Sequence, residues 1–139
     1  MARTVGEIMT IAPATVAPDD AARDAARVMR DQDVGAVLVL EGEELRGVVT
    51  DRDIAVRLVA EGRDPAGTPV REIATSDPTA VASDRPVEDA VRLMRGRALR
   101  RLPVTEHGRP VGIVSLGDLA VERDSDSALA DISASDPNR

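Results

Sequence analysis

Hydrophobic and polar positions along the chain follow two different patterns. In residues 87–94, and again in residues 22–29, apolar side chains recur at i, i+3, i+4 and i+7, which is the spacing of one apolar helix face. Between these stretches lie short apolar runs such as "AVLVL" (36–40) and "LPV" (102–104), each followed by a polar turn. Runs of this length bounded by turn residues are typical of buried strands. The pattern predicts a mixed α/β chain with short strands.

The whole pattern occurs twice. Residues 5–55 align with residues 70–120 at an offset of 65 without a gap, and 19 of the 51 aligned positions are identical. The alignment keeps identical residues of three different types in one register: Met29 with Met94, Gly47 with Gly112, and Asp53 with Asp118. Scattered matches from a biased composition would not readily do this, so the chain is interpreted as a tandem duplication.

Each copy is predicted to follow the order β-α-β-β-α. Asp19 and Asp84 stand where a helix N-cap is expected. One copy of about 50 residues is small for an independent fold. We therefore expect an α/β (α+β) fold in which two small sheets related by a pseudo-twofold axis pack together, with helices outside and paired clefts between the copies. The strands are expected at residues 15–16, at 36–40 and in the run ending at Thr50, and at 80–81, at 102–104 and in the run ending at Ser115.

The predicted domain boundaries follow from the repeat. The first repeat is placed at residues 1–60 and the second at residues 70–123. The connector at residues 61–69, "EGRDPAGTP", contains two Pro and two Gly, which favours a loop. Residues 124–139 are polar and poor in large apolar side chains, so we expect a mostly disordered tail with one short turn near residues 128–132.

Composition narrows the function classes. The chain has no Cys, Phe, Trp or Tyr, so its core must be aliphatic, and disulfides, thiolate metal sites and cysteine nucleophiles are excluded. A formal net charge of −7 disfavours nucleic acid as a partner. The first ten residues lack the apolar region of a signal peptide, and no apolar run approaches the ~20 residues that span a bilayer. These features predict a cytoplasmic protein without a membrane partner.

A Ser/Thr-x-x-Asp motif follows the last strand of each copy, as Thr50 with Asp53 and as Ser115 with Asp118. One interpretation is a capping box, in which the two side chains satisfy main-chain N–H groups at a helix start. The other is a ligand site, because a helix N-terminus with a hydroxyl suits a phosphate and a carboxylate one turn later can accept hydrogen bonds from ribose hydroxyls. The two interpretations are compatible.

The duplicated motifs resemble a family. The stretches "VGEIMT", "VREIATSDPTAV", "LRRLPV", "GVVTDRDIA" and "GIVSLGDLA", in this order over residues 3–123, resemble a pair of CBS domains. The layout is similar to small stand-alone CBS-pair proteins of actinobacteria, the kind to which the hypoxic response protein belongs. That resemblance implies a regulatory module for adenosyl ligands, with a link to stress responses.

The resemblance also implies site residues. The Ser/Thr-x-x-Asp pairs would contact ligand phosphate and ribose, and the segment that opens each repeat would line the opposite cleft. The middle strand would supply main-chain contacts and cations. The implied ligand-binding residues are Ser115, Asp118, Arg100, Arg101, Thr4 and Met9 for one cleft, and Thr50, Asp53, Val34, Gly35 and Ala36 for the other.

The two clefts are predicted to differ. Arg100 and Arg101 stand where Gly35 and Ala36 stand in the first copy, so the Ser115/Asp118 cleft is expected to be the better site for AMP, ADP or ATP. An alternative for the two arginines is a solvated strand edge. The Thr50/Asp53 cleft is expected to hold a less anionic adenosyl compound such as S-adenosylmethionine, or to stay empty.

The predicted function is a ligand sensor that acts through a homodimer or an unidentified protein partner, with no obligatory cofactor and no metal. The alternative is a structural or interaction protein with vestigial clefts. An enzyme is not expected, because no nucleophile–base pair is evident and the only histidine, His107, lies in a predicted turn.

Overall fold

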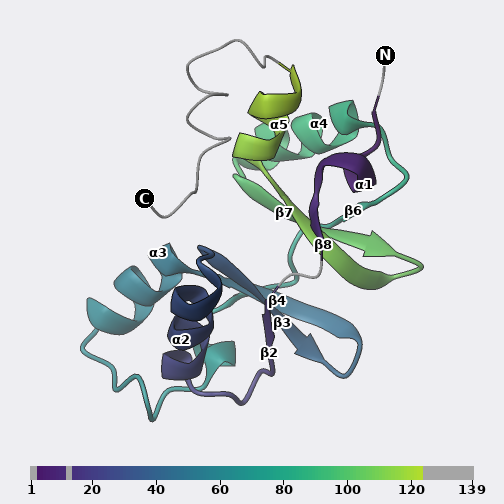
Figure 1. Cartoon of the computed structure of the whole chain (residues 1–139). Coiled ribbons are helices and arrows are strands. Elements are labelled where there is room, and N and C mark those ends of the chain that lie inside the picture. Colours follow the sequence, from purple (N-terminus) through teal and green to yellow (C-terminus); the bar gives the residue numbers. More distant parts are fainter. Residues whose placement is uncertain (1–2, 12–13, 124–139) are drawn as a thin grey trace. The chain divides into compact units, whose positions relative to one another are not determined.

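The computed structural model describes residues 3–11 and 14–123 (Figure 1), so the predicted disorder of the tail at residues 124–139 lies outside the described residues. Helices and strands alternate along the chain in two similar series. The helices are α1 (Val5–Ile8), α2 (Ala22–Gln32), α3 (Asp51–Asp53), the π-helix η1 (Ile54–Val59), the 3-10 helix η2 (Val70–Glu72), α4 (Val87–Arg97) and α5 (Leu116–Arg123). The strands are β1 (Thr10–Ile11), β2 (Thr15–Val16), β3 (Ala36–Glu41), β4 (Glu44–Thr50), β5 (Thr75–Ser76), β6 (Val81–Ala82), β7 (Arg101–Glu106) and β8 (Arg109–Ser115).

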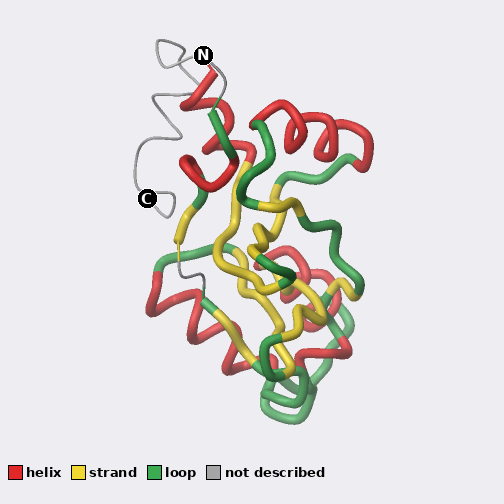
Figure 2. The backbone as a smooth tube through the Cα atoms, turned by 90° about the vertical axis from the view of Figure 1, so that its right-hand side faces the viewer, coloured by secondary structure: helices red, strands yellow, loops and turns green. Residues whose placement is uncertain are grey.

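The strands form two four-stranded sheets with the same topology. One has the order β2-β3-β4-β5 and the other, read in the equivalent direction, β6-β7-β8-β1. In each, the first pair is parallel and the other two are antiparallel. The longest strands are those of the β3–β4 and β7–β8 hairpins; strands are drawn in yellow in Figure 2. The predicted mixed α/β fold with two small sheets is confirmed.

The chain divides into two compact units that do not coincide with the two repeats. The unit called here the Thr50 unit is residues 14–78, and the Ser115 unit is residues 3–11 together with residues 79–123. The two repeats therefore exchange their opening segments: β1, from the start of the chain, pairs with β8, and β5 pairs with β4.

Main-chain hydrogen bonds hold each exchanged segment in the same way. The N–H of Ala22, at the start of α2, donates to the carbonyl of Thr68 at 2.8 Å. In the other unit the N–H of Val87 donates to the carbonyl of Arg3 at 2.9 Å. The first free N–H group of each long helix is thus satisfied by the segment that opens the other repeat.

This arrangement corrects the predicted helix caps. The N-cap residues are Ala21 and Pro86, with no side-chain cap, so the prediction that Asp19 and Asp84 cap these helices is wrong. An N-cap side chain would accept from the second or third N–H group of the helix. The third is already satisfied by main chain, because Asp24 donates to the carbonyl of Ala21 at 2.9 Å and Asp89 to that of Pro86 at 3.0 Å. Asp19 instead forms an ion pair with Arg71 of the exchanged segment.

Each unit has its own aliphatic core. In both cores, fully buried residues of an exchanged segment lie among the strands and helices of the other repeat: Val5 in the Ser115 unit, and Val70 and Ile73 in the Thr50 unit. Burying a valine or isoleucine side chain stabilises a fold by roughly 1.5–3 kcal/mol. The exchange therefore contributes to the hydrophobic core of both units.

The hairpin turn between β7 and β8 lies where the sequence predicts it. Its two central residues, His107 and Gly108, have φ of 52° and 78°, the positive values of a type I′ turn. His107 is an exposed turn residue. The equivalent turn between β3 and β4 contains Gly42 with φ of 63°.

The final helix differs between the copies. In the Ser115 unit it is the α-helix α5, whereas in the Thr50 unit the three residues of α3 continue into the π-helix η1. There the N–H of Ala60 donates to the carbonyl of Ala55 at 2.9 Å, and the N–H of Arg63 donates to that of Leu58 at 3.0 Å. Hydrogen bonds between residues five apart are rare in helices, and those that occur are frequently found at functional sites. In the part of the chain that the structure describes, no helix is long and apolar enough to cross a membrane.

Candidate functional site

The Thr50 and Asp53 side chains form a reciprocal pair at the start of α3. The N–H of Thr50 donates to Asp53 Oδ2 at 2.9 Å, and the N–H of Asp53 donates to Thr50 Oγ1 at 3.1 Å. Asp53 is one of the few buried charged residues, with 9% of its surface exposed. The capping interpretation of this motif is confirmed.

Ser115 and Asp118 repeat the same geometry at the start of α5. The N–H of Ser115 donates to Asp118 Oδ2 at 2.9 Å, and the N–H of Asp118 donates to Ser115 Oγ at 3.1 Å. In both copies one carboxylate oxygen is held by the cap, while the second oxygen of Asp118 has no protein partner among the described residues. Each carboxylate is therefore fixed in position, and its Oδ1 atom can still accept hydrogen bonds from a ligand.

The middle strand of each unit places its first residues beside the motif. Arg101 lies opposite Ser115 in the β7–β8 ladder, and the N–H of Leu116 donates to the carbonyl of Arg100 at 2.8 Å. Arg100 is exposed and Arg101 half-buried, and within residues 3–11 and 14–123 neither guanidinium makes an ion pair or a side-chain hydrogen bond. The main chain of two arginines without a side-chain partner among the described residues thus lies beside the N-terminus of an eight-residue helix.

The Thr50 unit has the equivalent arrangement without the cations. Ala36 lies opposite Thr50 in the β3–β4 ladder, and the N–H of Asp51 donates to the carbonyl of Gly35 at 3.0 Å. Val34 precedes them and is half-buried. The predicted motif residues and middle-strand residues of each copy are therefore brought together at the start of the last helix in their own unit.

The exchanged segments approach the same strands closely. A Cβ on Gly112 would lie 2.5 Å from Met9 Sδ and 2.6 Å from the Thr10 carbonyl oxygen, and a Cβ on Gly47 would lie 2.7 Å from the Thr75 carbonyl oxygen. These glycines stand three residues before Ser115 and Thr50, respectively. Met9 is thus adjacent to the strand that leads into the Ser115/Asp118 motif.

Thr4 is engaged at the other end of α1. Its N–H and its hydroxyl both donate to Glu7 Oε1, at 3.2 and 3.0 Å, and its main chain pairs with Pro86. These hydrogen bonds hold the pKa of Glu7 below its usual value, the main-chain bond from Thr4 being the main cause. Among the described residues Thr4 makes no hydrogen bond to Ser115 or Asp118, so a ligand contact from Thr4 stays a prediction.

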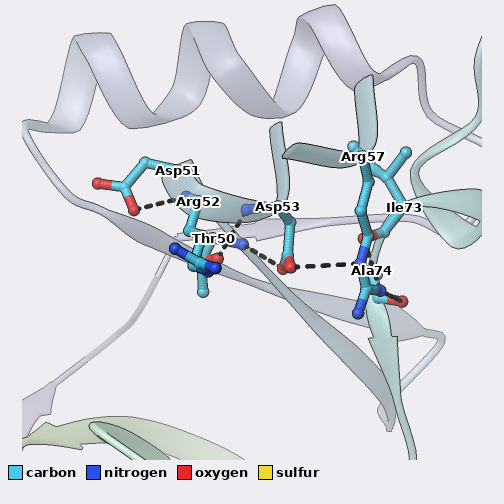
Figure 3. A network of polar contacts seen from close by, with 7 residues as sticks. All are labelled: Thr50, Asp51, Arg52, Asp53, Arg57, Ile73 and Ala74. Atoms are coloured by element: carbon cyan, nitrogen blue, oxygen red, sulfur yellow. Dashed lines mark hydrogen bonds and ion pairs between the residues drawn. The ribbon is translucent and has the colours of Figure 1, made fainter. Parts of the chain in front are cut away.

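The sequence analysis missed Arg57. Its Nε lies 3.8 Å from Asp53 Oδ1, and its Nη1 donates to the carbonyls of Ile73 at 3.3 Å and Ala74 at 3.4 Å (Figure 3). The spacing of four residues after Asp53 on a helix is a typical signal for such an ion pair. The position equivalent to Arg57 in the second copy holds Glu122.

The two motifs therefore carry different local charge. Around Thr50 two carboxylates, Asp51 and Asp53, are balanced by Arg52 and Arg57. Around Ser115 the equivalent positions hold two carboxylates, Asp118 and Glu122, while Arg100 and Arg101 make no ion pair with any described residue. An anionic group is favoured at the second motif over the first.

A hollow of about 500 Å³ lies elsewhere in the Ser115 unit. It is lined by residues of β6 and α4, including Asp89, which pairs with Arg85 and Arg92. None of its lining residues belongs to either Ser/Thr-x-x-Asp motif. The described residues also contain no group of three or more His, Cys, Asp or Glu side chains that could hold a metal ion.

Comparison with known proteins identifies the family. The CBS domain family matches residues 5–60 and 70–124, and this chain belongs to that family as a tandem pair. The chain is 42% identical to the CBS domain-containing protein YhcV of Bacillus subtilis over 134 residues, covering 94% of this chain and 95% of that protein. It is 31% identical to hypoxic response protein 1 of Mycobacterium tuberculosis over 118 residues, covering 84% and 82% of the two chains.

Two solved structures share the fold. The crystal structure of hypoxic response protein I, described with two coordinated zinc ions, superposes with a TM-score of 0.77 at 31% identity, covering 85% of this chain and 97% of that one. The CBS domain protein PAE2072 of Pyrobaculum aerophilum, described as complexed with AMP, superposes with a TM-score of 0.80 at 29% identity. That match covers 93% of this chain and 99% of the other.

Proposed function

We propose that this CBS pair is a regulatory module that binds an adenine nucleotide through the Ser115/Asp118 motif. The observation that carries the proposal is the pair of unneutralised arginines, Arg100 and Arg101, whose main chain is hydrogen-bonded or paired to the first residues of α5. Phosphate oxygens would lie between these guanidinium groups and the positive end of the α5 dipole. A similar fold described as complexed with AMP supports the ligand class.

Asp118 would orient the sugar. Its Oδ2 is fixed by the Ser115 N–H at 2.9 Å, so the carboxylate presents its other oxygen in a defined direction. Two adjacent ribose hydroxyls can donate to one carboxylate. Since the chain has no aromatic residue, adenine would pack against aliphatic side chains, and Met9 beside Gly112 is a candidate surface.

The Thr50/Asp53 motif is proposed to take a less anionic adenosyl compound, such as S-adenosylmethionine, or to stay empty. Its two carboxylates are balanced by Arg52 and Arg57, so it offers no excess positive charge to a polyphosphate. The site residues there are those of the first copy, from Gly35 and Ala36 to Asp53.

The test is a ligand panel on the full chain. Thermal unfolding is followed by calorimetry with AMP, ADP, ATP, S-adenosylmethionine and adenosine, because the chain has no Trp or Tyr to report by fluorescence. A ligand at about 100 times its dissociation constant adds roughly 2.7 kcal/mol, which raises Tm by on the order of 5 °C or more for a domain of this size. Asp118→Asn retains an acceptor for the cap but loses the charge, and it should abolish the shift with AMP.

Asp53→Asn is the matched control. Both variants alter the same cap, and Asp53→Asn also loses the ion pair with Arg57, so each ligand shift is measured against the Tm of its own unliganded variant, and only Asp118→Asn should lose AMP binding. Equal loss of binding in both variants would contradict the assignment to the second motif.

The second candidate function is a ligand-independent structural or interaction protein. It is favoured by the observation that both motifs already form complete capping boxes. No Tm shift with any compound in the panel would support it. Release of a product from a bound nucleotide would instead indicate an enzyme, which we do not propose.

We further propose a homodimer. Val56 and Val59 on η1 are 46% and 67% exposed, and burying such side chains between copies is favourable. Val59→Asp should shift the mass measured by light scattering toward that of one chain, while Arg52→Asp on the neighbouring turn should not.

A further inference from the structure

Arg57 contacts two parts of the Thr50 unit at once. Its Nε lies 3.8 Å from Asp53 Oδ1, while its Nη1 donates to the carbonyls of Ile73 and Ala74 (Figure 3). The Asp53 carboxylate is the ion-pair partner of that guanidinium and lies in the candidate ligand motif. The two carbonyls belong to the exchanged segment. One side chain therefore joins the motif to that segment.

The segment that Arg57 holds is the one that leaves the unit. Directly after Ala74 comes β5, which pairs with Gly47 and Val48 of β4, and the Thr50 unit ends at residue 78, where the chain continues into the Ser115 unit. β5 is only two residues long. A strand this short depends on contacts at its ends for its stability.

Asp53 is what orients Arg57. The Asp53 side chain is 12% exposed and the Arg57 side chain is 50% exposed. A half-exposed arginine has many rotamers available in water, and holding one of them costs conformational entropy. The charge of a fixed, mostly buried carboxylate offsets that cost and turns the guanidinium toward the carbonyls.

The second copy is built without this link. Its equivalent of Arg57 is Glu122, and no ion pair is found for Asp118 in the described part of the chain. The link is therefore a property of the Thr50 unit alone and not a general feature of the duplicated motif.

We propose that Arg57 is a positioning residue that couples the Asp53 carboxylate to residues 73–76. When the charge of Asp53 is shared with a ligand hydroxyl or removed, Arg57 releases the Ile73 and Ala74 carbonyls and β5 loosens. The ligand part of this statement rests on the proposed function of the Thr50/Asp53 motif. The coupling within the chain does not require a ligand and is tested without one.

The experiment is amide hydrogen exchange followed by mass spectrometry on the full chain, read at peptides covering residues 73–78. Arg57→Gln is expected to accelerate exchange there by roughly threefold to tenfold, since a charge-assisted tether is lost from a half-exposed position. Asp53→Asn leaves Arg57 in place and keeps an acceptor for the Thr50 N–H. It is expected to accelerate the same peptides to a similar extent.

Two matched controls isolate the effect. Arg52→Gln removes a neighbouring arginine that has no side-chain partner among the described residues, and Asp118→Asn makes the same carboxylate change in the other unit. Neither should change exchange at residues 73–78. Unchanged exchange in Arg57→Gln would overturn the proposal. Faster exchange in Arg57→Gln but not in Asp53→Asn would reduce Arg57 to a simple tether and would overturn the coupling.

In a final experiment, AMP or S-adenosylmethionine is added at about 5 mM, so that a compound with a dissociation constant in the millimolar range still occupies the site. A compound that binds at Asp53 is expected to accelerate exchange at residues 73–78 in the wild type and to have no such effect in Arg57→Gln. If both variants behave as expected without ligand but neither compound alters exchange in the wild type, the coupling stands. The Thr50/Asp53 motif is then the one that stays empty, and binding of S-adenosylmethionine there is excluded.

Discussion

The main-chain N–H of Leu116 donates to the carbonyl oxygen of Arg100 at 2.8 Å. This hydrogen bond joins the first residue of α5 to the residue just before β7. The main chain of Arg100 and Arg101 therefore lies beside the start of α5. In the other unit Asp51 and Gly35 make the same bond at 3.0 Å. The backbone at the start of the last helix is therefore the same in both units, and there the two motifs differ in the side chains that they carry.

That difference predicts how the arginines contribute to binding. Arg101→Gln should weaken AMP binding about tenfold, because a charge-assisted hydrogen bond to phosphate is lost, and should leave adenosine binding unchanged. Titration calorimetry with both compounds measures this. Arg97→Gln, an exposed arginine at the end of α4, is the control and should change neither. Equal losses for AMP and adenosine would show that Arg101 does not contact phosphate.

The exchange of opening segments predicts that a substitution in α1 destabilises the core of the Ser115 unit. Val5 is fully buried in the Ser115 unit, so Val5→Ala should lower the free energy of unfolding by about 2 kcal/mol. Urea unfolding followed by circular dichroism measures the loss. Ile11→Ala removes a larger side chain that is 71% exposed and should cost under ~0.5 kcal/mol. A Val5→Ala variant as stable as the wild type would mean that α1 is not part of this core.

Two glycines with opposite surroundings predict opposite effects. A Cβ at Gly47 would meet the Thr75 carbonyl oxygen at 2.7 Å, which is too close and cannot be relieved by a side-chain rotation. Gly47→Ala should therefore destabilise the Thr50 unit by roughly 1–3 kcal/mol. Gly96 lies in α4 with open space around it, and Gly96→Ala should stabilise by up to about 1 kcal/mol. Thermal unfolding of the two variants side by side compares them, and shifts of the same sign would contradict the close approach of β5 to β4.

The lowered pKa of the Glu7 carboxyl predicts that the stability of α1 depends on pH. Its pKa is held below the usual value by hydrogen bonds from Thr4 and, to a smaller extent, by Arg3. A lowered pKa in the folded state contributes stability above the unfolded pKa, and that contribution is lost as the pH falls through the folded pKa. NMR titration of the Glu7 carboxyl carbon should show the low value. Thr4→Ala should raise it toward the usual value, whereas Thr10→Ala should not change it.

Much of the fold could be predicted because its signals are local. The hairpin turn at His107 and Gly108, the apolar helix faces and both Ser/Thr-x-x-Asp caps each depend on residues a few positions apart. The 65-residue offset then confirmed each assignment with a second example. Local signals of this kind are read directly from spacing.

The exchange of opening segments could not be derived in that way. β1 and β5 have two residues each, which is too short to carry a strand period, and β1 pairs with a strand about 100 residues later. The same exchange explains why the predicted caps at Asp19 and Asp84 were wrong, since the satisfying carbonyls come from Thr68 and Arg3. A cap supplied by distant main chain leaves no signature in side chains.

The candidate sites were predicted in part. The motif residues and the strand residues beside them lie together in each unit, whereas their contact with a ligand stays a prediction. Arg57 was missed because its role depends on the carbonyls of Ile73 and Ala74, and the π-helix that carries it was not predicted from a sequence that also suits an ordinary α-helix.

The division of the Ser115 unit into two pieces has a consequence for how the protein is made. The Thr50 unit is a single stretch and is complete once residue 78 has left the ribosome, whereas residues 3–11 need strands that end at residue 115. At roughly 5–20 residues per second, the synthesis of residues 79–115 takes about 2–7 seconds. During that interval residues 3–11 still lack β8, so the half of the protein that begins first is the half that finishes folding last.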